Sequence, residues 1–246
     1  MALIEELNMQ GNRLFKHRSN LPIPFAVIGM ALYIYTIYFG GKAEHTLLFE
    51  TSCLAVGLLG LLIRAITLGY TPRGTSGRNT HGQVAESLNT KGMYSIMRNP
   101  LYLGNFFMWF AIILFINIHW FSLFYIMCFW VYYERIIFAE ENFLRNKYGE
   151  PYINWTLKTP IFLPRLSGWK KPELFFSFKN VLKREYSGFF AIFFTFTLFD
   201  LVENFVREST WEIDSFWMYA LLISGLITFI LRTLKKKTKI LNVSGR

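Results

Sequence analysis

The stretch LYLGNFFMWFAIILFINIHWFSLFYIMCFWVYY, residues 101–133, is apolar almost without a break. A helix needs about 20 apolar residues to cross a bilayer, so this stretch is too long for one span and long enough for two short ones. The polar residues of Asn117-Ile118-His119 mark the turn between them. We therefore predict a short helical hairpin, Leu101–Ile116 followed by Trp120–Tyr133, with tilted arms or a locally thinned membrane around it.

The composition of the whole chain agrees with a membrane protein. Of its 246 residues, 53% are hydrophobic and only 17% are charged, whereas soluble domains contain about 25% charged residues. Four more apolar runs have the length of a span: residues 21–39, 46–68, 188–206 and 215–231. We expect an all-α fold, a polytopic integral membrane protein with about six transmembrane helices including the hairpin.

The positive charges alternate along the chain. The net charge is +10, and 24 of the 26 Lys and Arg residues lie in alternate connections between the apolar runs. They form no continuous basic patch, so they indicate membrane topology rather than a nucleic-acid partner. This asymmetry predicts that both termini and the two long loops are cytoplasmic, at the inner membrane if the protein is bacterial.

Cysteine and histidine usage argues against a metal. Cys53 and Cys128 both lie in apolar stretches, where a thiol behaves as a small hydrophobic group. The four histidines have no Cys, Asp or Glu at ligand spacing, so we expect no metal site.

The chain shows no internal repeat and no long linker, so we treat residues 1–246 as a single membrane domain. Within it we expect a core at 46–166, followed by 167–246 with an interfacial helix and two additional spans. The amphipathic segments Met1–Ser19 and Pro172–Tyr186 are both expected to lie on the inner leaflet.

Two polar stretches, residues 71–100 and 134–165, flank the hairpin. Because the hairpin is antiparallel, its two ends are neighbours, which predicts a polar pocket at the membrane surface. Pro100 disfavours helical geometry at Asn99, so a corner with free N–H groups should precede the helix and could bind an anion. The plainer alternative is a helix start at the interface, with Arg98 acting only as a topology charge.

Residues 90–104, TKGMYSIMRNPLYLG, resemble the G-x-Y-x-x-x-R-[HN]-P-x-Y-x-G signature of the isoprenylcysteine carboxyl methyltransferase and phospholipid methyltransferase superfamily. The second conserved block of this superfamily is similar to residues 140–155, EENFLRNKYGEPYINW, together with the proline segment 160–165. The resemblance covers roughly residues 46–166. One departure is Asn99, where the family most often has His. Asn cannot titrate near neutral pH, so we expect no acid-base role for this position.

The resemblance implies an integral membrane enzyme, an S-adenosylmethionine-dependent methyltransferase whose two blocks enclose the cofactor at the cytoplasmic face. The cofactor-binding residues that it implies are Arg98, Asn99, Pro100, Tyr102, Gly104, Glu141, Tyr148 and Tyr152. Arg135 and Glu140 match active-site positions of the family and are the expected catalytic residues. Glu140 would suit the positive charge of the cofactor, and Arg135 could orient an anionic acceptor. For Glu141, a surface ion pair with Arg145 at i, i+4 is the plain alternative.

A loop with two glycines, hydroxyls and two arginines, YTPRGTSGRN, covers residues 70–79. Such a composition can form a backbone nest for phosphate, so Arg73, Ser76 and Arg78 are candidate substrate-binding residues. A flexible polar connection explains the loop equally well. A phosphate-binding loop would make the chain resemble the bacterial branch of the superfamily that methylates lipid phosphates.

The expected function is methyl transfer to an anionic oxygen, phosphate or carboxylate, of a membrane-embedded lipid or lipidated substrate. Such an oxygen needs only a cationic holder, whereas an amine must first lose a proton to a base. Two alternatives remain open: N-methylation of a phospholipid headgroup, and a non-catalytic lipid-binding protein of the same fold. Asp200 and Glu203 lie in the fifth predicted span, where hydration or pairing with Arg207 accounts for them.

Overall fold

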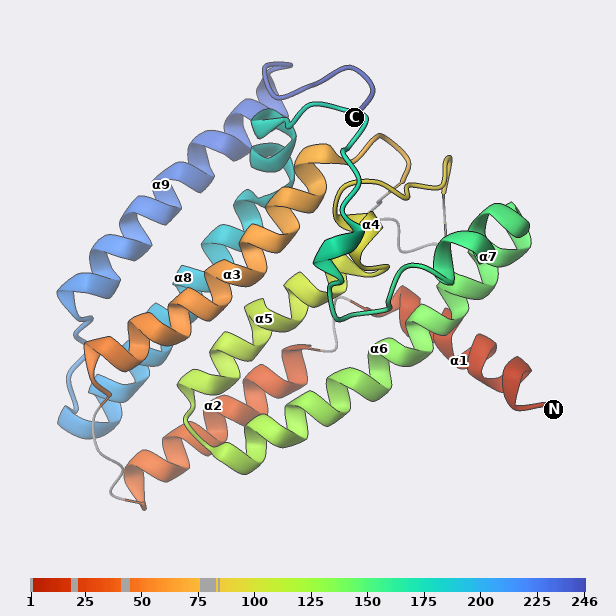
Figure 1. Cartoon of the computed structure of the whole chain (residues 1–246). Coiled ribbons are helices and arrows are strands. Elements are labelled where there is room, and N and C mark those ends of the chain that lie inside the picture. The colour runs from red at the N-terminus through yellow and green to blue at the C-terminus, as the bar shows by residue number, and fades with distance from the viewer. Residues whose placement is uncertain (1, 19–21, 41–44, 76–82, 84) are drawn as a thin grey trace.

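The protein is helical throughout the part that the structure, a computed structural model, describes (Figure 1). That part comprises residues 2–18, 22–40, 45–75, 83 and 85–246. Its helices are α1 (Leu3–Lys16), α2 (Pro22–Tyr38), α3 (Leu47–Tyr70), α4 (Met93–Ile96), α5 (Pro100–Phe115), α6 (His119–Tyr148), α7 (Glu150–Thr156), the short 3-10 helix η1 (Leu166–Gly168), α8 (Phe178–Glu208) and α9 (Ser215–Lys237). The expected all-α fold is confirmed for these residues.

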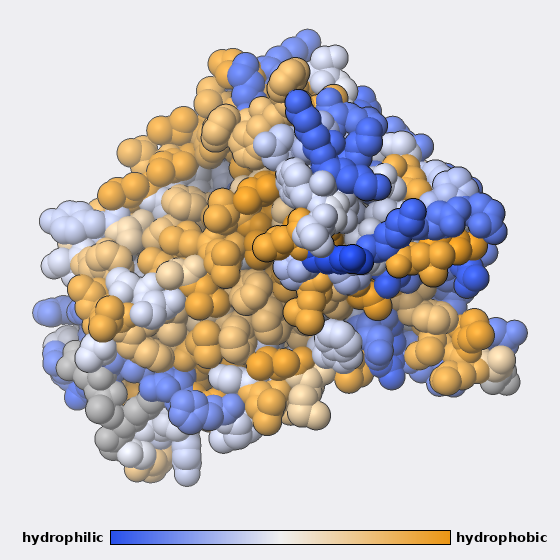
Figure 2. All heavy atoms as spheres, in the orientation of Figure 1, coloured by the Kyte–Doolittle hydropathy of each residue, from blue (hydrophilic) through white to orange (hydrophobic). Residues whose placement is uncertain are grey.

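The apolar helices indicate an integral membrane protein. Four of them, α3, α6, α8 and α9, are long and apolar enough to cross a membrane, while α2 and α5 are apolar but shorter. In Figure 2, hydrophobic residues cover the broad middle of the molecule, and hydrophilic residues gather toward the upper right, over the loops around α4. The expected number of about six spans stays a prediction.

The predicted hairpin is formed by α5 and α6, which turn at Ile116–Ile118. Asn117 has a φ of 56°, a left-handed conformation that Asn tolerates better than most residues. We expect the helix of the second arm to continue past Tyr133, and α6 does so, because neither glycine nor proline interrupts it before Gly149, whose φ is 59°. The charged residues that follow Tyr133 therefore continue on the same helix.

α3 crosses α5 at a pair of glycines. A Cβ atom on Gly104 would lie 2.8 Å from the Gly60 carbonyl oxygen and 2.4 Å from the Arg64 Cγ. Small residues at a helix crossing let two backbones approach closely in a membrane protein. The close crossing places the Arg64 side chain against α5, near the end of the hairpin that is opposite its turn.

The two predicted interfacial segments differ in outcome. α1 forms and packs on the end of α6, where Gly11 lies directly against the Arg135 backbone. A separate helix over Pro172–Tyr186 is not present. Instead α8 begins at Phe178, where the Ser177 hydroxyl accepts the Asn180 N–H at 3.3 Å, and no breaking residue separates this turn from the predicted span. Residues 178–186 are therefore the first turns of α8.

Candidate active site

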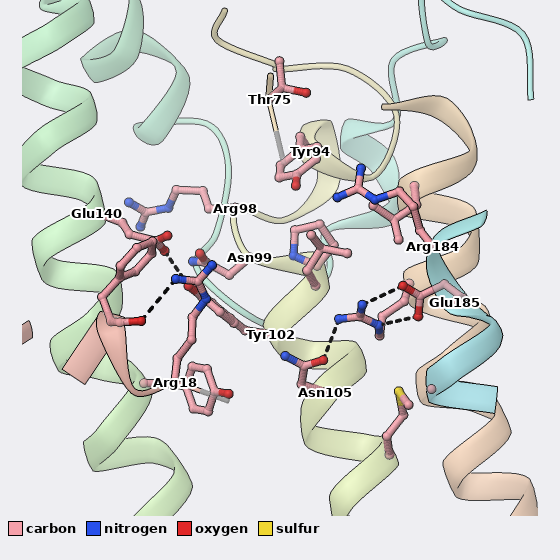
Figure 3. A pocket seen from close by; sticks show the side chains of 18 of the residues that line it. Arg18, Thr75, Tyr94, Arg98, Asn99, Tyr102, Asn105, Glu140, Arg184 and Glu185 are labelled. Carbon is pink, nitrogen blue, oxygen red and sulfur yellow. Dashed lines mark hydrogen bonds and ion pairs between the residues drawn. The ribbon is translucent and has the colours of Figure 1, made fainter. Parts of the chain in front are cut away.

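One end of the bundle encloses a cavity of about 730 Å³, within the range of about 300–1,000 Å³ found for small-molecule sites. Figure 3 shows it from close by. Seven of the predicted site residues line it: Arg98, Asn99, Pro100, Tyr102, Glu140, Glu141 and Tyr152. The two polar stretches that flank the hairpin thus form one concave surface.

An ion pair joins the two ends of the hairpin. Arg98 Nη1 donates to Glu141 Oε1 at 2.7 Å, and both side chains are mostly buried. Among the described ion pairs, the partner of Glu141 is Arg98 rather than Arg145. One residue earlier on α6, Glu140 Oε2 accepts the Tyr102 hydroxyl at 2.9 Å. Neighbouring carboxylates therefore project from α6 toward the start of α5.

α7 and the chain that follows it hold the first block in place. The hydrogen bonds that do so run from Arg98 N to Pro160 O at 2.8 Å, from Arg165 N to Ile96 O at 2.9 Å, and from Trp155 Nε1 to Tyr94 O at 2.9 Å. Asn99 has a φ of −124° and a ψ of 55°, so the expected non-helical corner before Pro100 is present. Its side-chain nitrogen donates to Ile161 O at 3.3 Å.

Two buried polar atoms of the cavity wall, Arg98 Nε and the Tyr152 hydroxyl, form no hydrogen bond of good geometry among the described residues, although the two side chains interact with each other. An unsatisfied buried polar group costs about 1–3 kcal/mol, so such atoms in a pocket indicate that a ligand or water completes it. Burial raises the pKa of the Tyr152 and Tyr94 phenols above the ordinary tyrosine value. Both phenols therefore stay protonated near neutral pH and act as hydrogen-bond donors rather than bases.

The other half of the cavity is built around Arg64. Its Nε and Nη2 donate to the two carboxylate oxygens of Glu185 at 2.7 Å each, and its Nη1 donates to Asn105 Oδ1 at 2.6 Å. Arg18, two residues after the end of α1, and Arg184 from α8 also line the cavity (Figure 3).

Sequence reasoning did not place these four charged residues in the site. Only Arg64 carried a usable signal, since a charge inside an apolar run is functional by default. Arg18, Arg184 and Glu185 lie outside the two motif blocks, and only the packing of α1 and α8 brings them to the cavity.

Four predicted site residues lie outside the cavity wall. Arg135 faces α1, where its Nε donates to Gln10 Oε1 at 3.1 Å. The Tyr148 hydroxyl donates to Ala85 O at 2.8 Å. Gly104 lies in the crossing with α3. The roles predicted for Arg135, Tyr148 and Gly104 stay predictions, and their positions outside the cavity wall do not support them.

The fourth is Arg73, whose backbone N–H donates to Gly245 O at 2.9 Å. Of the other predicted substrate-binding residues, Ser76 and Arg78 lie outside the described part of the chain. Thr75, immediately before them, does line the cavity.

The opposite end of the bundle holds a second polar cluster. Potential ligand atoms of His45, Glu50 and Glu203 lie within 4.8 Å of one another, so folding brings together groups that are far apart in sequence. Hydrogen bonds already hold both carboxylates, because Arg207 Nε donates to Glu203 at 2.8 Å and Trp217 Nε1 donates to Glu50 at 2.7 Å. The expected pairing with Arg207 is confirmed for Glu203, and the expected absence of a metal stays a prediction.

Fold and site together define a helical membrane protein with a polar cavity at one end of its bundle. Residues 48–151 match the family model described as phospholipid methyltransferase. The match confirms the resemblance to the superfamily and implies a membrane methyltransferase acting on lipids. No curated protein and no solved structure gives a significant match. The matched segment includes both ends of the hairpin, and α8 and α9 lie beyond it.

Proposed function

We propose that this protein is an S-adenosylmethionine-dependent methyltransferase that methylates an anionic oxygen of a membrane lipid. The observation that carries the proposal is the meeting of both family blocks in one cavity, where Arg98 pairs with Glu141 beside Glu140 and Tyr102. The family match to residues 48–151 supports methyl transfer to a lipid.

The wall around Glu140 and Glu141 fits a positively charged nucleotide. Their carboxylates offer negative charge to the ammonium or sulfonium group of S-adenosylmethionine. Tyr102 and Tyr152 provide aromatic faces nearby, and a cation over such a face gains about 0.5–2 kcal/mol. Arg98 Nε and the Tyr152 hydroxyl still have hydrogen-bonding capacity to offer a ligand. When bound, S-adenosylmethionine supplies a methyl group on a positively charged sulfur that leaves as a neutral thioether.

The chain itself has little acid-base work to do if the acceptor is an anionic oxygen. An anionic oxygen would accept the methyl group of bound S-adenosylmethionine without first losing a proton, so the residues of the cavity would not need to supply a base. No proton has to move, which agrees with protonated Tyr94 and Tyr152 and with a non-titrating Asn99. The protein's contribution is then to bind, align the two reactants in line and exclude water.

A second acceptor class, a headgroup amine, is favoured by one observation. Glu140 is a carboxylate in the cavity wall, and it accepts a hydrogen bond from the uncharged Tyr102 hydroxyl. Such a group could take the proton that an amine must lose before it attacks the methyl carbon. The description of the matched family as phospholipid methyltransferases is compatible with both acceptor classes.

Mass spectrometry of a total lipid extract tests the proposal. The extract is incubated with purified protein and S-adenosylmethionine carrying a deuterated methyl group, and heat-denatured protein serves as the control. We expect one lipid species to gain a single labelled methyl and to lose one negative charge from its headgroup. A labelled methyl on a headgroup amine would establish the second class instead, and no labelled lipid at all, with folded protein, would refute both.

A further inference from the structure

α8 provides one complete wall of the cavity, although it lies outside the segment that matches the family. Four cavity-lining residues, Arg184, Gly188, Ala191 and Thr195, recur along α8 at intervals of four, three and four. This spacing places them on a single stripe of the helix. At 1.5 Å per residue the stripe extends for about 16 Å, from the polar end of the cavity into the apolar part of the bundle.

A matching stripe of α5 lines the opposite wall and consists of Asn105, Met108, Trp109 and Ile112. α3 packs along both α5 and α8, whereas α5 and α8 contact each other little. The space between the two stripes is therefore part of the cavity and forms a groove. A Cβ atom on Gly188 would lie 3.1 Å from the Met108 Cε, so any larger side chain at this position would project into the groove.

The groove changes from polar to apolar along its length. At its polar end Arg184 lines the cavity beside the bidentate pair of Arg64 and Glu185, so this part of the wall carries two guanidinium groups and one carboxylate. In Figure 3, Arg184 lies near Tyr94 and Thr75, across the cavity from Glu140 and Arg98. At the other end, Ile112 and Ile192 are apolar, and Ala191 is exposed on the surface of the bundle.

We propose that this groove binds a lipid with an anionic headgroup, with the headgroup at Arg184 and one acyl chain between α5 and α8. Arginine matches phosphate and carboxylate groups through paired N–H donors. The exposed Ala191 end opens toward the region where acyl chains would surround the helices. The headgroup would lie across the cavity from Glu140 and Glu141, the carboxylates proposed to bind the methyl donor. The assignment of this lipid as the methyl acceptor therefore rests on the proposed function.

Lipid retention by the purified protein tests the headgroup site. Native mass spectrometry measures binding of phosphatidylglycerol and phosphatidylcholine to the wild type, Arg184→Gln and Arg232→Gln. Arg232 is the matched control, because it is exposed near the same end of the bundle on α9 but does not line the cavity. We expect the wild type to retain one phosphatidylglycerol at least tenfold more tightly than phosphatidylcholine, and only Arg184→Gln to lose this preference.

The groove is tested separately at Gly188. The Gly188→Ala variant needs only a small movement of the flexible Met108 end, whereas a leucine would fill the space between the stripes. We expect Gly188→Leu to reduce phosphatidylglycerol retention at least tenfold and Gly188→Ala to keep it. A phosphatidylglycerol with a photoreactive acyl chain should cross-link to α5 and α8 in the wild type.

Isothermal titration with S-adenosylmethionine separates this inference from the proposed function. Unchanged donor binding in Arg184→Gln and Gly188→Leu, together with lost lipid retention, supports a distinct acceptor site. Equal retention of phosphatidylglycerol by the wild type and Arg184→Gln would overturn the headgroup assignment. Selective lipid retention in a wild type that binds no S-adenosylmethionine would refute the proposed function and leave the lipid site standing.

Discussion

Glu140 is the residue on which binding of a positively charged methyl donor depends most directly. Replacing it with Gln keeps its size and its capacity to accept the Tyr102 hydroxyl but removes the charge. We expect Glu140→Gln to raise the dissociation constant for S-adenosylmethionine by about tenfold or more, since two unit charges about 4 Å apart attract strongly in a partly buried site. Isothermal titration measures this change.

Glu134→Gln is the control for that experiment. Glu134 is on the same helix but is exposed, with its carboxylate 3.8 Å from Arg135, and exposed ion pairs contribute little. Its loss should leave donor affinity nearly unchanged. Equal weakening in both variants would mean that the charge of the helix as a whole, rather than the position of Glu140, matters.

Helix geometry explains why Arg135 does not reach the cavity although Glu140 does. Residues five apart on an α-helix are rotated by about 140° from each other, whereas residues seven apart lie nearly in line. Tyr133 precedes Glu140 by seven residues and does line the cavity. This separation could have been predicted from the sequence, because the continuing helix was itself expected. The motif comparison alone gave no information on the direction of each side chain.

At the scale of elements, Arg135 serves the docking of α1 on α6. We expect Arg135→Ala to remove its hydrogen bond to Gln10, worth about 1 kcal/mol, and so to raise hydrogen exchange in residues 3–16 about fivefold. Hydrogen-exchange mass spectrometry measures this, with exposed Arg145→Ala on the same helix as the control. Lost methyl transfer without faster exchange would support the catalytic role that the family resemblance implies for Arg135.

The crossing of α3 and α5 sets where Arg64 enters the cavity. A methyl group at Gly104 would meet the Gly60 carbonyl oxygen at 2.8 Å, and backbone cannot move aside easily. We expect Gly104→Ala to destabilise the protein by about 1–3 kcal/mol, the usual cost of overpacking a core. Thermal unfolding in detergent measures the loss. Gly225→Ala on α9 is the control, because its nearest contact would be an ordinary 3.6 Å to Phe190, and an equal loss there would contradict the role of the crossing.

At the scale of the whole molecule, the sequence predicted the hairpin and the meeting of Arg98 with Glu140 and Glu141 on one surface. These follow from apolar length and from the antiparallel direction of α5 and α6, which are properties of adjacent segments. The contribution of α8 did not follow, because Arg184 and Glu185 reach the cavity only through packing between segments distant in sequence. The first turns of α8 were assigned to the interface because their composition is amphipathic, but nothing in the chain breaks the helix there.

Orientation in the membrane is the remaining property of the whole molecule, and it follows from charge rather than from packing. Lys171 lies at the cavity end, and Glu212 lies in the connection at the other end between α8 and α9. The strong excess of Lys and Arg at the cavity end predicts that this end is cytoplasmic. A chain lacking both native cysteines, Cys53 and Cys128, provides the background for single cysteines at the two positions.

In that background, Glu212→Cys should react with a membrane-impermeant maleimide in intact cells, because the thiol faces the outside. Lys171→Cys should react only after the membrane is permeabilised. The same cavity would then draw S-adenosylmethionine from the cytosol, where this donor is made, and would receive lipids from the surrounding bilayer. Labelling of Lys171→Cys in intact cells would contradict this orientation, because the donor site would then be separated from the cytosol.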